Sequence, residues 1–136
     1  MPAGYSGTPL VKKLGIKPGF SMLLKHKPEN YFDLLEELPP DVTIVETEDS
    51  LPVDFIHFFV KDAGVLIEEF PSLKTRLGKN GLMWVSWPKK AAKVETDIDG
   101  NLVREVGLSN GLVDIKVCAV DEIWSGLKFV YRVKER

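Results

Sequence analysis

The sequence predicts an α/β domain of truncated Rossmann-like design, with a mixed and mostly parallel sheet that carries helices on both faces. In the first two thirds of the chain, apolar runs of strand length alternate with segments of helical periodicity, which is typical of a parallel sheet. The apolar runs 113–120 and 127–133 are joined by too few residues for a parallel crossover, so they predict a C-terminal antiparallel hairpin. The 136 residues, 44% of them hydrophobic, match one globular unit, and we expect residues 1–136 to form a single domain.

The N-terminal part predicts a short helix followed by a strand. Thr8 suits the N-cap of a helix over residues 10–14, and Pro9 suits its first position. Gly15 can adopt the left-handed conformation that ends a helix. Residues 20–25 are an apolar run between turn residues and predict the first strand.

The next segments predict one helix and two further strands. Residues 29–38 place apolar side chains three or four apart, as on one face of a helix. Residues 42–46 are rich in β-branched side chains, and residues 54–60 are almost entirely apolar, as in a central strand covered on both faces. The connection 47–53 is short for a helical crossover. Two alternatives stay open: it crosses the sheet in extended form, or it joins an antiparallel pair.

Residues 63–77 have helical spacing, although we expect Pro71 to bend this helix or divide it in two. Gly78 is the expected stop signal. Residues 79–81 then predict a turn that leads into a fourth strand over residues 82–87.

A last short helix is predicted over residues 102–108, ended by Asn110 and Gly111, and it leads into the C-terminal hairpin. If the four preceding strands have the spatial order second, first, third, fourth, the strand order reverses between the first and the third strand.

Composition and charge exclude several function classes. The net charge of −2 gives no overall attraction for nucleic acid or an anionic membrane, so such binding would require a local basic patch. No run is long enough to span a bilayer, and the first twenty residues carry no apolar stretch of signal-peptide kind, which predicts a cytoplasmic protein. Cys118 is the only cysteine and lies in an apolar run, which indicates a core residue without a disulfide or zinc role.

Several segments resemble an uncharacterised family of small bacterial proteins, a domain of unknown function. These segments are GYSGTPL at 4–10, KLGIKPG at 13–19, WVSWPKK at 84–90, VREVGL at 103–108, the run 113–121 and WSGL at 124–127. The resemblance implies a grouping and supplies no mechanism. At the level of the fold, the chain also resembles class I methyltransferases, whose doubly wound sheet likewise ends in an antiparallel hairpin.

This second resemblance directs attention to the loop after the first strand. A dinucleotide or S-adenosylmethionine site needs glycines there, because only bare backbone lets the ligand approach closely. Residues 25–30 contain no glycine, so we expect the usual cofactor site to be lost. Glu46, at the end of the second strand, is where an acid would hold a ribose, although an exposed residue at a strand end is the favoured interpretation.

Ligands of open α/β sheets bind beyond the carboxyl ends of the strands, where the strand order reverses. The side chains expected at this edge are His26, Lys61, Asp62, Trp87, Lys89 and Lys90. Cations beside an apolar wall predict a small anionic or nucleotide-like ligand. The alternative, which we favour, is that these lysines are only solvent-exposed residues at strand ends. His26 could act as an acid or base near neutral pH, or be a plain surface histidine.

Other candidates have structural interpretations. His57 lies within an apolar run and predicts a neutral, hydrogen-bonded core residue. Asp97 and Asp99 resemble a calcium loop only faintly, and a turn is the better interpretation. Trp124 is expected near the tip of the last hairpin, where it can pack on the rest of the domain or on another subunit. No metal-ligand spacing and no nucleophile elbow is present.

The leading functional hypothesis is a relative of the Rossmann-like methyltransferases without evident catalytic machinery, which binds a small anionic ligand or a protein partner. The alternative is an S-adenosylmethionine-dependent methyltransferase, or another nucleotide-dependent enzyme, with an altered cofactor loop. A third possibility is a small assembly or regulatory subunit that forms homo-oligomers. We assign no cofactor, and we expect neither a membrane nor a nucleic acid as a partner.

Overall fold

The structure is a computed structural model that describes residues 8–46 and 51–136. Its centre is a six-stranded sheet with the strand order β2-β1-β3-β4-β6-β5. The first four strands run parallel, and β6 is antiparallel to both β4 and β5. This confirms the predicted mixed sheet and the order of its first four strands. The strands are β1 Ser21–Lys25, β2 Thr43–Val45, β3 Val53–Phe59, β4 Leu77–Pro88, β5 Leu112–Ala119 and β6 Trp124–Tyr131.

The strands β2 and β3 lie on opposite sides of β1. Ser21 of β1 is paired with Thr43 of β2, and Met22 is paired with Phe55 of β3, both in parallel register. Since β2 and β3 point the same way, the alternative of an antiparallel pair is wrong. Residues 47–50 of their connection lie outside the described residues.

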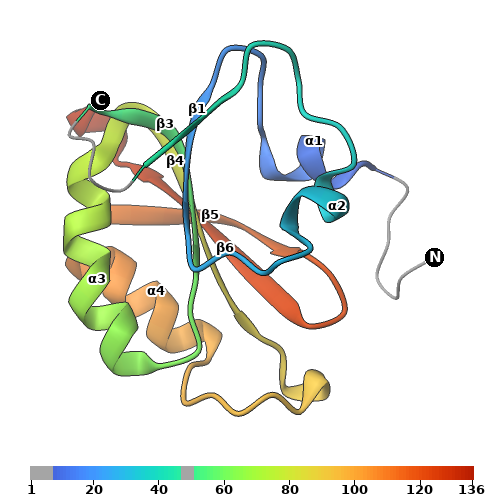
Figure 1. The fold of residues 1–136 in the computed structure, drawn as a ribbon. Coiled ribbons are helices and arrows are strands. Elements are labelled where there is room, and N and C mark those ends of the chain that lie inside the picture. The colour runs from blue at the N-terminus through green and yellow to red at the C-terminus, as the bar shows by residue number, and fades with distance from the viewer. Residues whose placement is uncertain (1–7, 47–50) are drawn as a thin grey trace.

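Helices cover both faces of the sheet, as predicted. The longer helices α3 (Ala63–Arg76) and α4 (Gly100–Ser109) pack on one face, and the short helices α1 (Leu10–Leu14) and α2 (Tyr31–Leu35) lie on the other (Figure 1). Two short 3-10 helices, η1 (Lys90–Ala92) and η2 (Val133–Glu135), complete the described elements.

The ends of two helices differ from the expectation. Pro9 is the N-cap of α1 and no side chain caps this helix, so Thr8 is not the cap. Gly15 has a φ of 82° and ends α1 as predicted. The stop signal assigned to Gly78 is wrong, because α3 ends at Arg76 and the chain enters β4 directly at Leu77.

The same region explains the early start of β4. Residues 79–81, expected as a turn, lie inside β4, where the register with β3 shifts between Val53 and Phe55. Pro71 does not divide α3, which remains one helix. Pro71 is exposed, while Phe70 and Leu73 beside it are buried, and we infer that this packing holds the helix across the missing amide.

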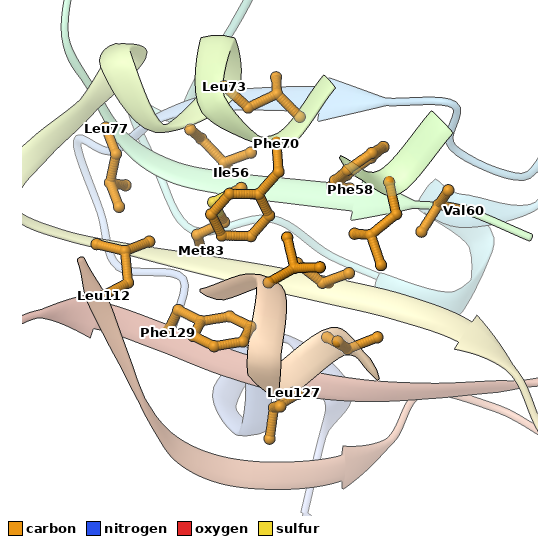
Figure 2. Packing of buried hydrophobic residues seen from close by; sticks show 14 of the residues in the cluster. Ile56, Phe58, Val60, Phe70, Leu73, Leu77, Met83, Leu112, Leu127 and Phe129 are labelled. Carbon is orange, nitrogen blue, oxygen red and sulfur yellow. The ribbon is translucent and has the colours of Figure 1, made fainter. Parts of the chain in front are cut away.

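Two hydrophobic cores hold the layers together. The larger lies between the sheet and helices α3 and α4, with Phe58, Phe70 and Phe129 at its centre (Figure 2). The smaller lies under α1 and α2 and includes Trp84, whose indole Nε1 donates a 2.8 Å hydrogen bond to the carbonyl of Leu14. Together these cores fix the carboxyl ends of β1 and β3 beside each other.

Candidate functional site

A pocket of about 520 Å³ opens at the carboxyl ends of β1 and β3. This is the point where the strand order reverses, and it is where open α/β sheets bind their ligands. The volume lies within the usual range for small-molecule sites. The residues that line it are His26, Pro28, Phe59, Val60, Lys61, Asp62, Val65 and Trp124.

The apolar part of the pocket comes from the end of β3, the start of α3 and the start of β6. The rings of Phe59 and Trp124 meet edge to face, with centroids 5.0 Å apart and an interplanar angle of 86°. Val60 and Val65 supply aliphatic surface beside them. Such a combination suits the ring of a ligand.

His26 follows β1 directly and has a φ of 57°, in the left-handed region that favours glycine. Its Nε2 lies 2.8 Å from Oε1 of Glu69 in α3, and Nζ of Lys25 lies 3.8 Å from the same oxygen. The imidazole is half exposed and also lies beside Phe58, with ring centroids 6.2 Å apart. The loop therefore turns sharply after β1, although it does so on a histidine where a cofactor loop would use glycine.

Lys61 and Asp62 connect β3 to α3. The carboxylate of Asp62 accepts a 3.1 Å hydrogen bond from the amide of Val65 and caps the helix. Asp97 accepts a 2.7 Å hydrogen bond from the amide of Ala63, so a second carboxylate holds the same helix end. Asp62 thus has a structural role in addition to its place in the pocket wall.

The structure brings together three of the six residues expected at this edge. His26, Lys61 and Asp62 line the pocket, whereas Trp87, Lys89 and Lys90 do not. Side chains alternate along a strand, and Trp87 is directed to the face of α3 and α4, where it packs on the larger core.

The strand β4 also continues further than predicted. It reaches Pro88, and the amide of Lys89 then donates a 2.8 Å hydrogen bond to the carbonyl of Ile123, while Lys90 begins η1. The aromatic wall comes instead from Trp124. Pro88 is paired with Trp124 across the antiparallel strands β4 and β6, so the start of β6 reaches this edge.

Glu46 follows β2 and is exposed. Its carbonyl accepts a 3.3 Å hydrogen bond from Nη1 of Arg76, and Glu46 does not line the pocket. The weakly predicted ribose-binding role therefore stays a prediction.

A buried polar chain lies under the pocket. The hydroxyl of Tyr31 is hydrogen-bonded to Nδ1 of His57 at 2.9 Å, and Nε2 of His57 is hydrogen-bonded to Oγ of Ser86 at 2.7 Å. Burial lowers the pKa of His57 to about 3 and raises the pKa of Tyr31. A serine that is hydrogen-bonded to a histidine resembles an activated nucleophile. All three side chains are fully buried, so no substrate reaches them.

No group of three or more His, Cys, Asp or Glu side chains among residues 8–46 and 51–136 could hold a metal ion. Asp97 caps α3, and Asp99 accepts a 2.9 Å hydrogen bond from the amide of Leu102 at the start of α4. Both acids therefore lie at helix ends, and α4 already begins at Gly100, so residues 97–101 do not form a separate turn. No helix in the described part of the chain is long and apolar enough to cross a membrane.

Comparison with known proteins shows the fold and does not show a family or a function. No family model matches the chain, and no curated protein matches it in sequence. The solved structures that it resembles include a magnesium protoporphyrin IX methyltransferase from Synechocystis PCC 6803 with bound SAH, at 8% identity and a TM-score of 0.60, covering 90% of this chain and 78% of the other. The fold is thus similar to the Rossmann-like fold of these methyltransferases, in a truncated form.

Two further matches agree. A 1,6-didemethyltoxoflavin-N1-methyltransferase from Burkholderia thailandensis is 11% identical, with a TM-score of 0.58 and coverage of 88% of this chain and 73% of the other. A SAM-dependent methyltransferase from Aquifex aeolicus is 16% identical, with a TM-score of 0.55 and coverage of 88% and 86%. The resemblance to an uncharacterised bacterial family stays a prediction, and the first part of its GYSGTPL motif lies outside the described residues.

Proposed function

We propose that the pocket between β1 and β3 binds S-adenosylmethionine or a closely related adenosine-containing ligand, and that the chain is an S-adenosylmethionine-dependent methyltransferase with an altered loop after β1. The observation that carries this proposal is the position of the pocket. It opens at the point of strand-order reversal in a sheet with the methyltransferase arrangement.

The charges of the pocket support a zwitterionic ligand better than a purely anionic one. Without Lys89 and Lys90, the wall carries one lysine, Lys61, and one carboxylate, Asp62. The imidazole of His26 is engaged by Glu69. S-adenosylmethionine carries a carboxylate together with ammonium and sulfonium charges, so both signs in the wall can find a partner.

The apolar walls suit the remainder of such a ligand. Phe59 and Trp124 present aromatic surface on which an adenine ring can pack. Bound S-adenosylmethionine would supply an electrophilic methyl group. The chain itself offers His26 at the pocket wall, where Glu69 holds one ring nitrogen and the other can take a proton from a nucleophile.

One observation favours a second candidate function, a binding protein that performs no transfer. The residues after β1 lack glycine, and the side chain of His26 occupies space that bare backbone leaves open in the usual cofactor loop. Such a protein would bind the nucleoside without positioning its methyl group.

Titration calorimetry with S-adenosylmethionine and S-adenosylhomocysteine tests the binding step. We expect saturable heat that Trp124→Ala reduces at least tenfold in affinity, since the ligand would lose one aromatic wall. Lys90→Ala, outside the pocket, is the matched control and should bind as the unmodified chain does. Absence of heat with both nucleosides at millimolar concentration would refute the proposal.

Methyl transfer is tested separately, by mass spectrometry of candidate acceptors incubated with the chain and S-adenosylmethionine. Transfer that is lost in His26→Ala while nucleoside binding remains supports the enzyme. Nucleoside binding without transfer to any acceptor favours the silent binding protein.

A further inference from the structure

A second surface, which shares no residue with the lining of the pocket, lies on the face of β5 and β6 opposite to α3 and α4. Lys116 of β5 and Lys128 of β6 are direct cross-strand partners, and Lys128 is in turn paired with Trp84 of β4. Trp84 belongs to the smaller core under α1 and α2, and directly paired residues point to the same face. Both lysines therefore share the face on which α1 lies.

Three further lysines gather around this pair. A side-chain carbon at Gly15 would lie 3.5 Å from Nζ of Lys128, so this ammonium group lies against the end of α1. Burial lowers the pKa of Lys128, and the positive charges of Lys116 and Lys17 lower it further. Lys17 therefore lies close to the cross-strand pair.

The other two lysines are Lys13, which lies two residues before Gly15 in α1, and Lys89, whose amide donates a hydrogen bond to the carbonyl of Ile123 just before β6. Burial raises the pKa of the Cys118 thiol, while the nearby charges of Lys13, Lys116 and Lys89 act in the opposite direction. Lys13 lies in α1 and Lys89 follows β4. We call the surface formed by Lys13, Lys17, Lys89, Lys116 and Lys128 the lysine face.

Within residues 8–46 and 51–136, no lysine of the lysine face forms an ion pair with a carboxylate. The ion pairs found there join Glu69 to Lys25 and His26, and Arg104 to Asp114. Asp114 is paired with Phe129, a residue of the larger core, so it points to the opposite face of the sheet. Like charges directly opposite each other on neighbouring strands destabilise a sheet, as for Lys116 and Lys128. These lysines lie together although the net charge of the whole chain is −2. An anionic partner bound at the lysine face would relieve this local repulsion.

We propose that the lysine face binds the sugar–phosphate backbone of a nucleic acid duplex. A duplex presents about one negative charge per 1.7 Å of its axis, which suits several lysines held on one rigid sheet face. None of its five residues is aromatic, and Phe32 of α2 is the only exposed large aromatic residue in the described segments. Without aromatic platforms for stacking, such a surface contacts phosphates and does not read unpaired bases.

The same observations disfavour a membrane as the partner. Stable attachment to a bilayer needs apolar anchors beside the basic residues. The lysine face consists of cations over the buried Trp84 and Cys118, and the exposed Val117 beside Lys116 is paired with Leu127 of the larger core, so Val117 points to the opposite face. The net charge of −2 gives no overall attraction for nucleic acid, and the lysine face is the local basic patch that such binding requires.

Fluorescence anisotropy with a labelled short DNA duplex tests the proposal. We expect binding at about 50 mM salt, with log K falling against log salt at a slope of about −4 to −5 if all five lysines contact phosphates. The double variant Lys17→Gln/Lys116→Gln should reduce the affinity on the order of a hundredfold and the slope by about two. Both residues are exposed, so the fold should persist, which circular dichroism would verify.

The matched control is Lys27→Gln/Lys134→Gln, which removes the same charge from exposed positions outside the lysine face. We expect it to bind the duplex as the unmodified chain does. The absence of duplex binding at low salt would overturn the proposal, and so would an equal loss of affinity in both double variants. Binding to anionic phospholipid vesicles or to heparin, with the duplex left unbound, would overturn it as well.

Discussion

The imidazole of His57 stacks on the ring of Phe59, with centroids 4.2 Å apart and an interplanar angle of 21°. Phe59 lines the pocket, and His57 is held beneath it by hydrogen bonds to Tyr31 and Ser86. The polar chain in the core therefore fixes the orientation of an aromatic wall. A change at His57 should be felt both in the free energy of unfolding and in the pocket.

Replacement of His57 by Leu should destabilise the domain by about 2–5 kcal/mol, because it leaves the buried hydroxyls of Tyr31 and Ser86 without partners. Urea unfolding followed by circular dichroism measures this change. The triple variant Tyr31→Phe/His57→Leu/Ser86→Ala removes every member of the chain and should recover part of the loss. A stability of His57→Leu equal to that of the unmodified chain would show that the network contributes little.

The buried His57 also predicts a pH dependence of stability. Its pKa is about 3 in the folded chain and about 6.5 when unfolded, so the unfolded state binds the extra proton. The stability from this group is full above pH ~6.5 and falls progressively down to about pH 3, by about 4–5 kcal/mol in all. Urea unfolding at several pH values should show this decline in the free energy of unfolding. The variant His57→Gln should lack the part of the decline that comes from protonation of His57. An identical decline in both proteins would contradict the assignment.

The parts of the fold that depend on local pattern could be predicted from the sequence. The apolar run 54–60 predicts a central strand, the short link before the last strand predicts an antiparallel hairpin, and both are confirmed. What failed were the boundaries. Gly78 resembles a helix stop, yet the pairing of Leu77 with Val53 begins a strand there, and such pairing is invisible in the local sequence.

The position of the candidate site could be predicted from the sequence, whereas only some of the residues that line it could. Its position follows from strand order, which explains why His26, Lys61 and Asp62 come together. Trp87 lies elsewhere because side chains alternate along β4, so Trp87 points to the face opposite to that of the buried Trp84. Trp124 could have been found from the antiparallel pairing of β6 with β4, which returns the start of β6 to the carboxyl end of β4.

Gly107 in α4 predicts a packing effect that is independent of any ligand. A side-chain carbon at this position would lie 2.0 Å from Cε1 of Phe129, a fully buried ring that packs edge to face on Phe70. Gly107→Ala should therefore destabilise the domain by about 1–3 kcal/mol or more, despite the better helix propensity of alanine. Thermal unfolding would measure the loss.

The companion variant Gly107→Ala/Phe129→Leu makes room for the added methyl group and should be less destabilised than the sum of the two single changes predicts. Strict additivity of the single changes would mean that Gly107 and Phe129 are not coupled as the packing indicates.

Asp62 allows its structural role and its role in the pocket to be separated. Asp62→Ala removes the cap that the amide of Val65 requires and should destabilise α3 by about 0.5–2 kcal/mol. Asp62→Asn keeps an oxygen for the cap and removes the negative charge, so its free energy of unfolding should stay near that of the unmodified chain. If the carboxylate binds a cationic group of the ligand, Asp62→Asn should still lose about tenfold in nucleoside affinity by calorimetry. Unchanged affinity in Asp62→Asn would show that this carboxylate acts only as a helix cap.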